Sequence, residues 1–150
     1  MSIILHPNRE KSLLRRHPWV FASAIKSVDT SPAPGSTVEL VSSEGQFLAR
    51  ASYSPTSQIR ARVWTFKDEP VEKEFFRGRI RSAIQKRLML GVERFSNAYR
   101  LVHGESDGIP GLIVDRYGDV LVLQSLTAGC EFWKETIADI LVEETGVQNI

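Results

Sequence analysis

The chain has 150 residues, of which 42% are hydrophobic and 25% charged, with one cysteine and no apolar run of 18 residues. It is long enough to bury a core, and its composition excludes a disordered or collagen-like chain, a disulfide framework, a metal site of several cysteines and a membrane-spanning helix. The net charge of +1 is a cancellation, because residues 1–100 carry 17 basic and 9 acidic residues and residues 101–150 carry 2 and 9.

The front of the chain therefore has a net charge of +8 and the remainder a net charge of −7. A basic region of this kind favours a polyanionic partner. The start shows no secretory signal and one cysteine suits a reducing compartment, so we expect a cytoplasmic protein without membrane contact.

The first elements are predicted to be a short strand and a short helix. Residues 3–5 form a brief apolar run, and the pattern predicts a helix over residues 9–16 with Asn8 as its N-cap. His17 precedes Pro18 and is therefore restricted to extended backbone, which stops the helix.

Four further strands are predicted within the first 69 residues, each bounded by Pro, Gly or Ser. They are Phe21–Val28, Thr37–Val41, Gln46–Tyr53 and Ile59–Phe66. Strands spaced this closely favour a small mixed barrel or sandwich.

The segment Asp68–Pro70 is the predicted boundary between two regions, because the hydrophobic period changes there from 2 to 3.6. A helix is predicted over residues 71–90, with apolar side chains on one arc and arginines mostly outside it. The arc comprises Phe76, Ile80, Ala83, Ile84 and Leu88.

Beyond Gly91 the pattern alternates between strands and turns and then gives a second helix. The predicted elements are a strand at 99–103, a turn-rich segment at 104–111, strands at 112–115 and 120–126 joined by a turn at 116–119, a helix at 131–144 and the onset of a strand at 147–150. Because the chain stops inside that last strand, we expect the front part of a longer protein. The alternative is a natural edge strand that closes the sheet.

The helix at 9–16 is the strongest candidate binding feature. At 100° per residue, Leu13 and Leu14 face the core while several cations share the other side, where an anion such as an RNA phosphate offsets their repulsion. His17 and Trp19 beside them could stack on a base, although we favour a core position for Trp19. The alternative is a solvated basic face. The candidate residues are Arg9, Lys11, Ser12, Arg15, Arg16 and His17.

The strand at 59–66 alternates cleanly, which places Arg60, Arg62, Trp64 and Phe66 on one face. Cations beside aromatic rings make a reasonable nucleic-acid platform. The alternative is that the aromatic half of this set is buried, and the sequence does not decide between the two.

No catalytic, cofactor or metal site is predicted in these residues. The glycines of residues 104–111 match neither a dinucleotide fingerprint nor a phosphate loop. Asp107 is expected to cap a turn rather than to gather with Glu105 and Asp115 around a cation. The three histidines lack ligand spacing, and Cys130 at a helix start has no neighbouring base.

Three segments together resemble a known family, in the same order and over nearly the entire chain. They are Arg9–Phe21 (REKSLLRRHPWVF), Tyr53–Trp64 (YSPTSQIRARVW) and Gly104–Gly118 (GESDGIPGLIVDRYG). They resemble the N-terminal part of the bacterial ribosomal RNA large subunit methyltransferase I family, whose members use S-adenosyl-L-methionine (SAM) to methylate cytosine at C5 in 23S rRNA.

The resemblance implies an α+β chain with two domains. Residues 1–69 would be a PUA-like mixed β pseudo-barrel that binds RNA, and residues 71–150 most of a small α/β central domain. The Rossmann-like methyltransferase domain, with the family's SAM-binding and catalytic-cysteine motifs, would lie beyond residue 150. The resemblance thus implies no cofactor in this chain, SAM in the full-length parent, and no catalytic role for Cys130.

Two functions follow as expectations. The first is an RNA-binding region that positions 23S rRNA for a catalytic domain missing from this chain, through the candidate residues above together with Arg60 and Arg62. The second is a scaffold that docks that domain or forms a homodimer, with little RNA affinity of its own. We expect the 150 residues alone to be inactive in methyl transfer.

Overall fold

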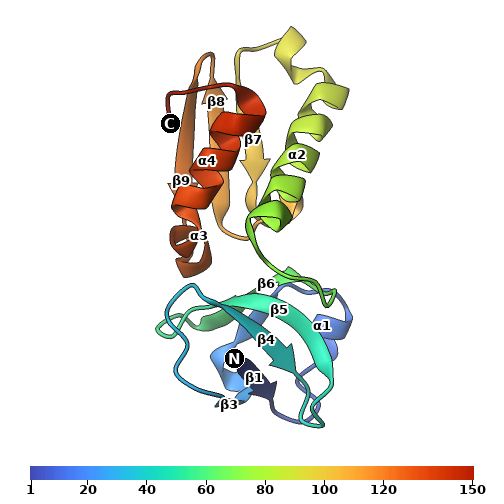
Figure 1. Ribbon diagram of the computed structural model, residues 1–150. Coiled ribbons are helices and arrows are strands. Elements are labelled where there is room, and N and C mark those ends of the chain that lie inside the picture. The colour runs from blue at the N-terminus through green and yellow to red at the C-terminus, as the bar shows by residue number, and fades with distance from the viewer. The chain divides into compact units, whose positions relative to one another are not determined.

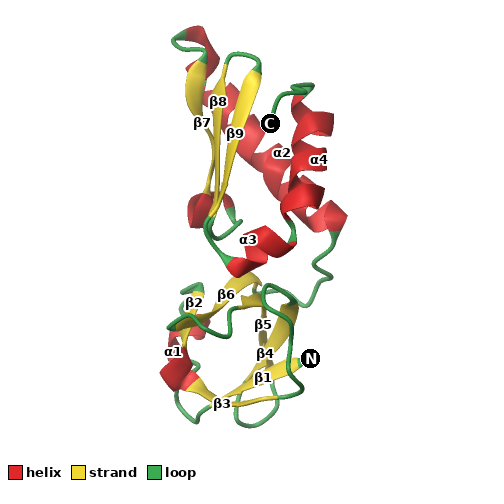
Figure 2. Ribbon diagram, turned by 90° about the vertical axis from the view of Figure 1, so that its left-hand side faces the viewer, coloured by secondary structure: helices red, strands yellow, loops and turns green.

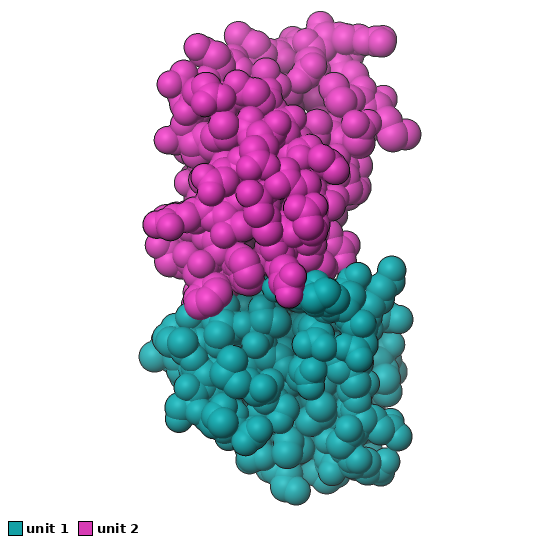
Figure 3. All heavy atoms as spheres, viewed as in Figure 1, with its two compact units in different colours: residues 1–71 teal, residues 72–150 magenta.

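The computed structural model describes residues 1–150 and divides into two compact units, which we call unit 1 (residues 1–71) and unit 2 (residues 72–150) (Figure 3). The division falls one residue after Pro70. The α+β class expected from the sequence is confirmed, with strands dominating unit 1 and helices packed on a sheet in unit 2 (Figure 1).

Unit 1 is a six-stranded curled sheet with one short helix (Figure 2). Its elements are β1 (Ser2–Leu5), α1 (Lys11–Leu14), β2 (Trp19–Phe21), a 3-10 turn (Ala22–Ala24), β3 (Ile25–Val28), β4 (Thr37–Val41), β5 (Phe47–Tyr53) and β6 (Ile59–Thr65). The strand order is β2-β6-β5-β4-β1-β3, antiparallel except for the parallel pair β1 and β4.

The curl of this sheet follows from its irregular ladders. Four of the five strand pairs contain a register shift, and such bulges bend strands and increase their twist. The concave side holds the core of unit 1, to which alternate residues of the strands contribute together with Leu13 of α1. The core comprises Ile3, Leu5, Leu13, Val20, Val38, Leu40, Ala49, Ala51, Ala61 and Val63.

Two predictions for unit 1 were wrong in detail. The strand predicted over residues 21–28 is broken by the 3-10 turn Ala22–Ala24, so that β2 pairs with β6 while β3 pairs with β1 at the far edge of the sheet. The helix predicted over residues 9–16 is limited to Lys11–Leu14.

Unit 2 packs two helices on one face of a three-stranded antiparallel sheet of order β7-β8-β9 (Figure 2). Its elements are α2 (Lys73–Leu90), a 3-10 turn (Val92–Arg94), β7 (Ala98–His103), a 3-10 turn (Gly104–Asp107), β8 (Leu112–Tyr117), β9 (Val120–Ser125), α3 (Ala128–Phe132) and α4 (Lys134–Thr145). Phe76 and Ile80 of α2 and Ile137 and Ile140 of α4 are fully buried.

The hairpin predicted between β8 and β9 is present. Tyr117 pairs with Val120, so Gly118 and Asp119 form a two-residue turn, and Gly118 adopts the left-handed φ of 62° that such turns require. The helix predicted over 131–144 is instead two helices separated at Trp133. The strand predicted over 147–150 is present only as a parallel bridge between Asn149 and Val120.

Candidate nucleic-acid interface

The end of α1 places an arginine where helices usually place a glycine. The N–H of Arg16 donates to the Leu13 carbonyl at 2.8 Å, and the N–H of His17 donates to the Ser12 carbonyl at 2.9 Å. This is the Schellman arrangement, whose C′ residue is left-handed, and Arg16 indeed has φ 63°. A left-handed conformation costs a non-glycine residue about 1–2 kcal/mol. The backbone conformation at position 16 would therefore be more stable with glycine than with arginine.

The predicted basic residues of this segment are all exposed. Arg9, Lys11, Ser12, Arg15, Arg16 and His17 each lie on the surface. The prediction that both leucines face the core was wrong for one of them: Leu13 is 2% exposed, whereas Leu14 is 67% exposed. Consecutive residues of a helix point about 100° apart, so only Leu13 of α1 reaches the core.

The strand β2 brings two further candidates next to this segment. Trp19 of β2 is directly opposite Arg62 of β6, and residues opposite each other in a ladder share a face. The His17 ring lies edge-on to the Trp19 ring, with the ring centroids 5.7 Å apart. Trp19, Arg60 and Arg62 are all half-buried. The fold therefore places Arg62 beside Trp19, which His17 contacts in turn.

The aromatic half of the strand at 59–66 does not form an open platform. Trp64 is 3% exposed. β6 ends at Thr65, and Phe66 packs against the core of unit 1 instead of continuing on the face of Arg60. Of the two alternatives for this strand, the structure favours burial of its aromatic residues.

None of the basic candidates in unit 1 forms an ion pair with a carboxylate within 4.0 Å, and this holds for Arg9, Lys11, Arg15, Arg16, Arg60 and Arg62 alike. Arg50 is the one unit 1 cation that does, with Glu39 at 3.1 Å and Asp68 at 2.6 Å. Glu10 is the only acidic residue between Arg9 and Arg16. The surface around α1 therefore carries cations whose charge no neighbouring acid offsets.

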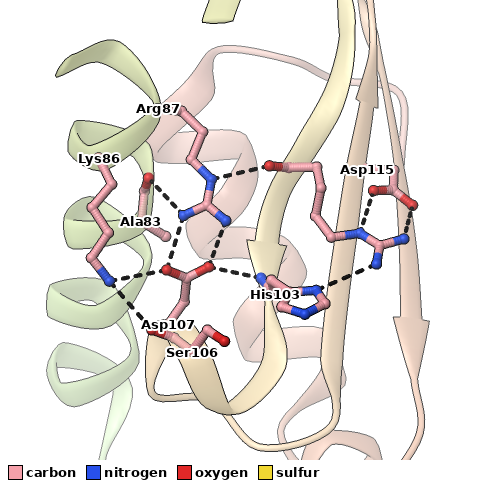
Figure 4. Close-up of polar contacts among 8 residues, drawn as sticks. Ala83, Lys86, Arg87, His103, Ser106, Asp107 and Asp115 are labelled. Carbon is pink, nitrogen blue, oxygen red and sulfur yellow. Dashed lines mark hydrogen bonds and ion pairs between the residues drawn. The ribbon is translucent and has the colours of Figure 1, made fainter. Parts of the chain in front are cut away.

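Unit 2 arranges its charges differently, around the buried carboxylate of Asp107 (Figure 4). The side chain of Asp107 is 3% exposed and accepts two hydrogen bonds from Arg87, at 2.9 and 2.7 Å. Lys86 donates a third at 3.0 Å and the backbone N–H of His103 a fourth at 2.8 Å. The predicted turn-capping role of Asp107 accounts for only one of these four contacts, the hydrogen bond from the His103 N–H.

This cluster joins α2 to β7 and to the turn after it. Burial alone would raise the pKa of Asp107, but the hydrogen bonds from Arg87, His103 N–H and Lys86 together lower it. Arg87 also donates to the carbonyl of Arg100 at 3.0 Å, so a backbone acceptor on the edge strand β7 is already satisfied. Arg87 precedes Asp107 by 20 positions, a spacing that no sequence pattern links.

The outer side of this sheet carries a second ion pair. Arg100 donates to Asp115 at 2.9 Å and 3.1 Å, which lowers the pKa of the Asp115 carboxyl. Both lie beside an open, mainly apolar groove of about 900 Å³ between the last turns of α2 and β7. The predicted alternative in which Asp107 and Asp115 share a cation does not fit, because each carboxylate binds arginine.

The two helices of unit 2 are joined by a third set of ion pairs. Arg77 contacts Glu144 at 2.9 Å and Glu143 at 2.6 Å, and Arg81 contacts Glu144 at 2.7 Å. Hydrogen bonds from Arg81 and Arg77 lower the pKa of Glu144, and hydrogen bonds from Lys73 and Arg77 lower that of Glu143. Lys73, Arg77 and Arg81 of α2 are thus paired with acids of α4.

Cys130, at the start of α3, makes contacts of a structural kind. Cys130 is buried, and its Sγ lies 3.1 Å from the carbonyl of Pro110, while its N–H donates to the side chain of Thr127, the N-cap of α3. No group of three or more His, Cys, Asp or Glu side chains is placed to hold a metal ion. No helix is both long and apolar enough to cross a membrane.

Comparison with known proteins adds an independent line of evidence. Residues 3–66 match the model of the PUA-like domain. The chain is 48% identical over 143 residues to ribosomal RNA large subunit methyltransferase I of Shewanella amazonensis, and 49% identical over 140 residues to that of Salmonella arizonae. These matches cover 95% and 93% of this chain but only 36% and 35% of the relatives, so the chain spans about a third of their length.

Solved structures share the fold. A SAM-dependent methyltransferase from Streptococcus mutans superposes with a TM-score of 0.83 at 18% identity, covering 98% of this chain and 38% of that one. A methyltransferase complexed with SAH gives a TM-score of 0.85 at the same identity and coverage. The likeness at this identity concerns the fold alone. The sequence matches and the PUA-like domain together show that the chain is similar, over nearly all of its length, to the N-terminal part of ribosomal RNA large subunit methyltransferase I.

Proposed function

We propose that unit 1 binds ribosomal RNA and positions it for a catalytic domain that lies outside these residues. A PUA-like domain in the N-terminal part of an rRNA methyltransferase supports an RNA-binding or accessory role. The proposed phosphate contacts come from the exposed segment around α1 and from β6. They are Arg9, Lys11, Ser12, Arg15, Arg16, His17, Arg60 and Arg62.

The observation that carries this proposal is that the basic residues around α1 and on β6 have no acidic partners, unlike Arg50 of the same unit. Clustered cations repel one another, and unpaired surface charge is tolerated where a polyanion neutralises it. In unit 2 the cations of α2 other than Arg79 have carboxylate partners. The distances are 2.6 to 2.9 Å for Arg77, Arg81 and Arg87. Contacts to phosphate fix the position of a nucleic acid without reading its sequence, which suits a positioning role.

The rest of the proposal concerns the parent protein. Residues 1–69 would be its PUA domain and residues 71–150 its central α/β domain. SAM would be the cofactor of the full-length protein, bound by the missing C-terminal domain, with 23S rRNA as the substrate and the cytoplasm as the location. No residue of this chain is assigned a catalytic role.

The test is the salt dependence of RNA binding. For single-stranded RNA, log K falls by about 0.7 per phosphate contact against log salt, so four contacts give a slope near −3. The variant Arg9→Gln with Lys11→Gln and Arg15→Gln removes three exposed cations and is expected to weaken binding at least tenfold at low salt and to make the slope shallower by about 2. Fluorescence anisotropy with labelled RNA at several salt concentrations measures both.

The control variant removes one exposed cation of unit 2. Lys134 is paired with the neighbouring Glu131, so Lys134→Gln should leave the slope of log K against log salt unchanged. An identical slope for the triple variant and the wild-type chain would exclude the surface around α1.

A second candidate function is supported by exposed apolar side chains in unit 2. Met89, Leu90 and Phe95, at and just after the end of α2, are 86%, 72% and 88% exposed. Large exposed apolar side chains that lie close together mark protein contacts. The alternative role as a scaffold or homodimer therefore belongs to this end of unit 2. Size-exclusion chromatography with and without RNA separates the two functions, since a dimer that is indifferent to RNA favours the scaffold.

A further inference from the structure

A small cavity lies next to the basic surface of unit 1, and Arg16 is the one proposed phosphate contact that lines it. It measures about 140 Å³ and is lined by residues of α1, its end, β5 and the residue after β6. The contacts between α1 and β5 place these elements side by side (Figure 1). The lining comprises Leu13, Leu14, Arg16, Phe47, Leu48 and Phe66.

Both aromatic rings of this cavity are covered by arginines. The Arg16 guanidinium lies 4.9 Å from the centroid of the Phe66 ring, and that of Arg50 lies 5.9 Å from the centroid of Phe47. The two arginines differ in their other partners, because Arg50 is ion-paired with two carboxylates whereas Arg16 is paired with none. Arg16 therefore presents a planar cation that remains available to a ligand, directly at the cavity.

Two features show that the local backbone is not optimised for stability alone. Arg16 occupies the left-handed C′ position of α1, where glycine carries no steric penalty. Leu14, which lines the cavity, remains 67% exposed. Strained residues of this kind persist where the side chain has a function.

We propose that this cavity binds one unpaired pyrimidine base of the RNA, with Arg16 stacked on the base and the neighbouring cations on its phosphates. A cavity of about 150 Å³ holds one benzene molecule, so the 140 Å³ of this half-open pocket matches the size of a single six-membered ring. Base recognition in single-stranded RNA relies on stacking against aromatic rings and guanidinium planes. The chemical class of the ligand is thus a single-ring nucleobase within a polyanionic strand.

This inference rests on the proposed function of unit 1, and the experiment separates the two. Three labelled probes of about 12 residues are compared by anisotropy at one low salt concentration: oligouridine, oligoadenosine and an abasic ribose-phosphate chain of equal charge. Oligouridine is expected to bind about 5- to 10-fold more tightly than the other two, since stacking of a single base is worth that factor or more. Binding of no probe overturns both proposals, whereas equal binding of all three overturns only the base site.

Variants then assign the preference to the cavity. Arg16→Lys keeps the charge and loses the plane, and Leu14→Trp fills the cavity from an already exposed position; both should reduce the preference for oligouridine to less than 2-fold. Arg15→Lys is the matched control, since Arg15 is exposed and does not line the cavity, and it should keep the preference. Equal behaviour of Arg16→Lys and Arg15→Lys would overturn the assignment.

The variant Arg16→Gly tests whether misfolding causes the loss of the preference for oligouridine. Glycine relieves the left-handed strain, so this variant should unfold at the same temperature as the wild type or a few degrees higher, while it loses the oligouridine preference. A lower unfolding temperature together with an intact preference would contradict both the strain argument and the role of Arg16.

Discussion

The basic residues around α1 of unit 1 and most cations of α2 in unit 2 differ in their partners. In unit 1 the basic residues around α1 have no carboxylate partners, and an arginine occupies a backbone position that favours glycine. In unit 2 Arg77 and Arg87 are each held by two or more short contacts to acidic side chains. The difference teaches that the number of cations in a sequence says little about nucleic-acid binding until their partners are known.

The largest expected effect comes from removing the carboxylate of Asp107, the buried partner of Arg87 in unit 2. Asp107→Ala leaves the largely buried Arg87 without its partner, and loss of one member of a buried pair costs about 3–5 kcal/mol. The expected result is a corresponding fall in the unfolding free energy of unit 2, measured by urea denaturation. Asp115→Ala, whose partner Arg100 is 45% exposed, should cost no more than about 1 kcal/mol. Equal losses of unfolding free energy for the two variants would show that the Asp107 cluster stabilises unit 2 no more than the exposed pair does.

In unit 1 the stabilising element should be apolar. Leu13→Ala creates a cavity in the core, and such a substitution costs about 2–5 kcal/mol. Leu14→Ala, at the exposed neighbouring position, should change stability by less than about 0.5 kcal/mol. Thermal unfolding of the two variants measures the contrast, and similar losses would mean that α1 buries both leucines.

Acid should affect the units differently. The pKa values of Asp107, Asp115, Glu143 and Glu144 are lowered in the folded protein, so their stabilisation is present above the unfolded values near 4 and is lost as pH falls through the folded values. Unit 2 should therefore lose stability below about pH 5. Amide NMR signals of the two units, followed from pH 7 to pH 3, measure this, and earlier loss of unit 1 signals would contradict the prediction.

The smallest expected effect tests whether a cation that loses its acidic partner attracts RNA. Glu143→Gln with Glu144→Gln releases Arg81 from its acid and leaves Arg77 with Glu74 alone. If free cations attract RNA, the affinity of the chain should rise by about 2-fold at low salt and return to the wild-type value at high salt. Anisotropy titrations measure the change, and an unchanged affinity at low salt would show that unpaired charge is not sufficient.

The sequence predicted what depends on neighbouring residues. The long helix α2, the two-residue hairpin at Gly118 and the mixed sheet of unit 1 follow from local periodicity and turn residues. The end of α1 was not predictable, because Arg16 adopts a backbone conformation that its side chain disfavours. The break at Ala22–Ala24 was missed because its cause is the pairing of β3 with β1, a contact between distant residues.

The candidate site shows the same division. Exposure of the basic residues around α1 follows from composition and helical spacing. The cavity was missed because its walls come from three segments, around Leu14, Phe47 and Phe66, and no spacing in the sequence indicates that they meet. The pairing of Arg87 with Asp107 was missed for the same reason.

The position of β1 in the sheet has a consequence for how unit 1 is made. β1 lies between β3 and β4, so residues 2–5 have their first partner once residue 28 has been synthesised and their second once residue 41 has been. The ladder between β1 and β4 can therefore form only later in synthesis than the ladder between β1 and β3. Removal of the first five residues would leave β3 with no neighbour in the sheet, so this short strand is what joins β3 to the rest of unit 1.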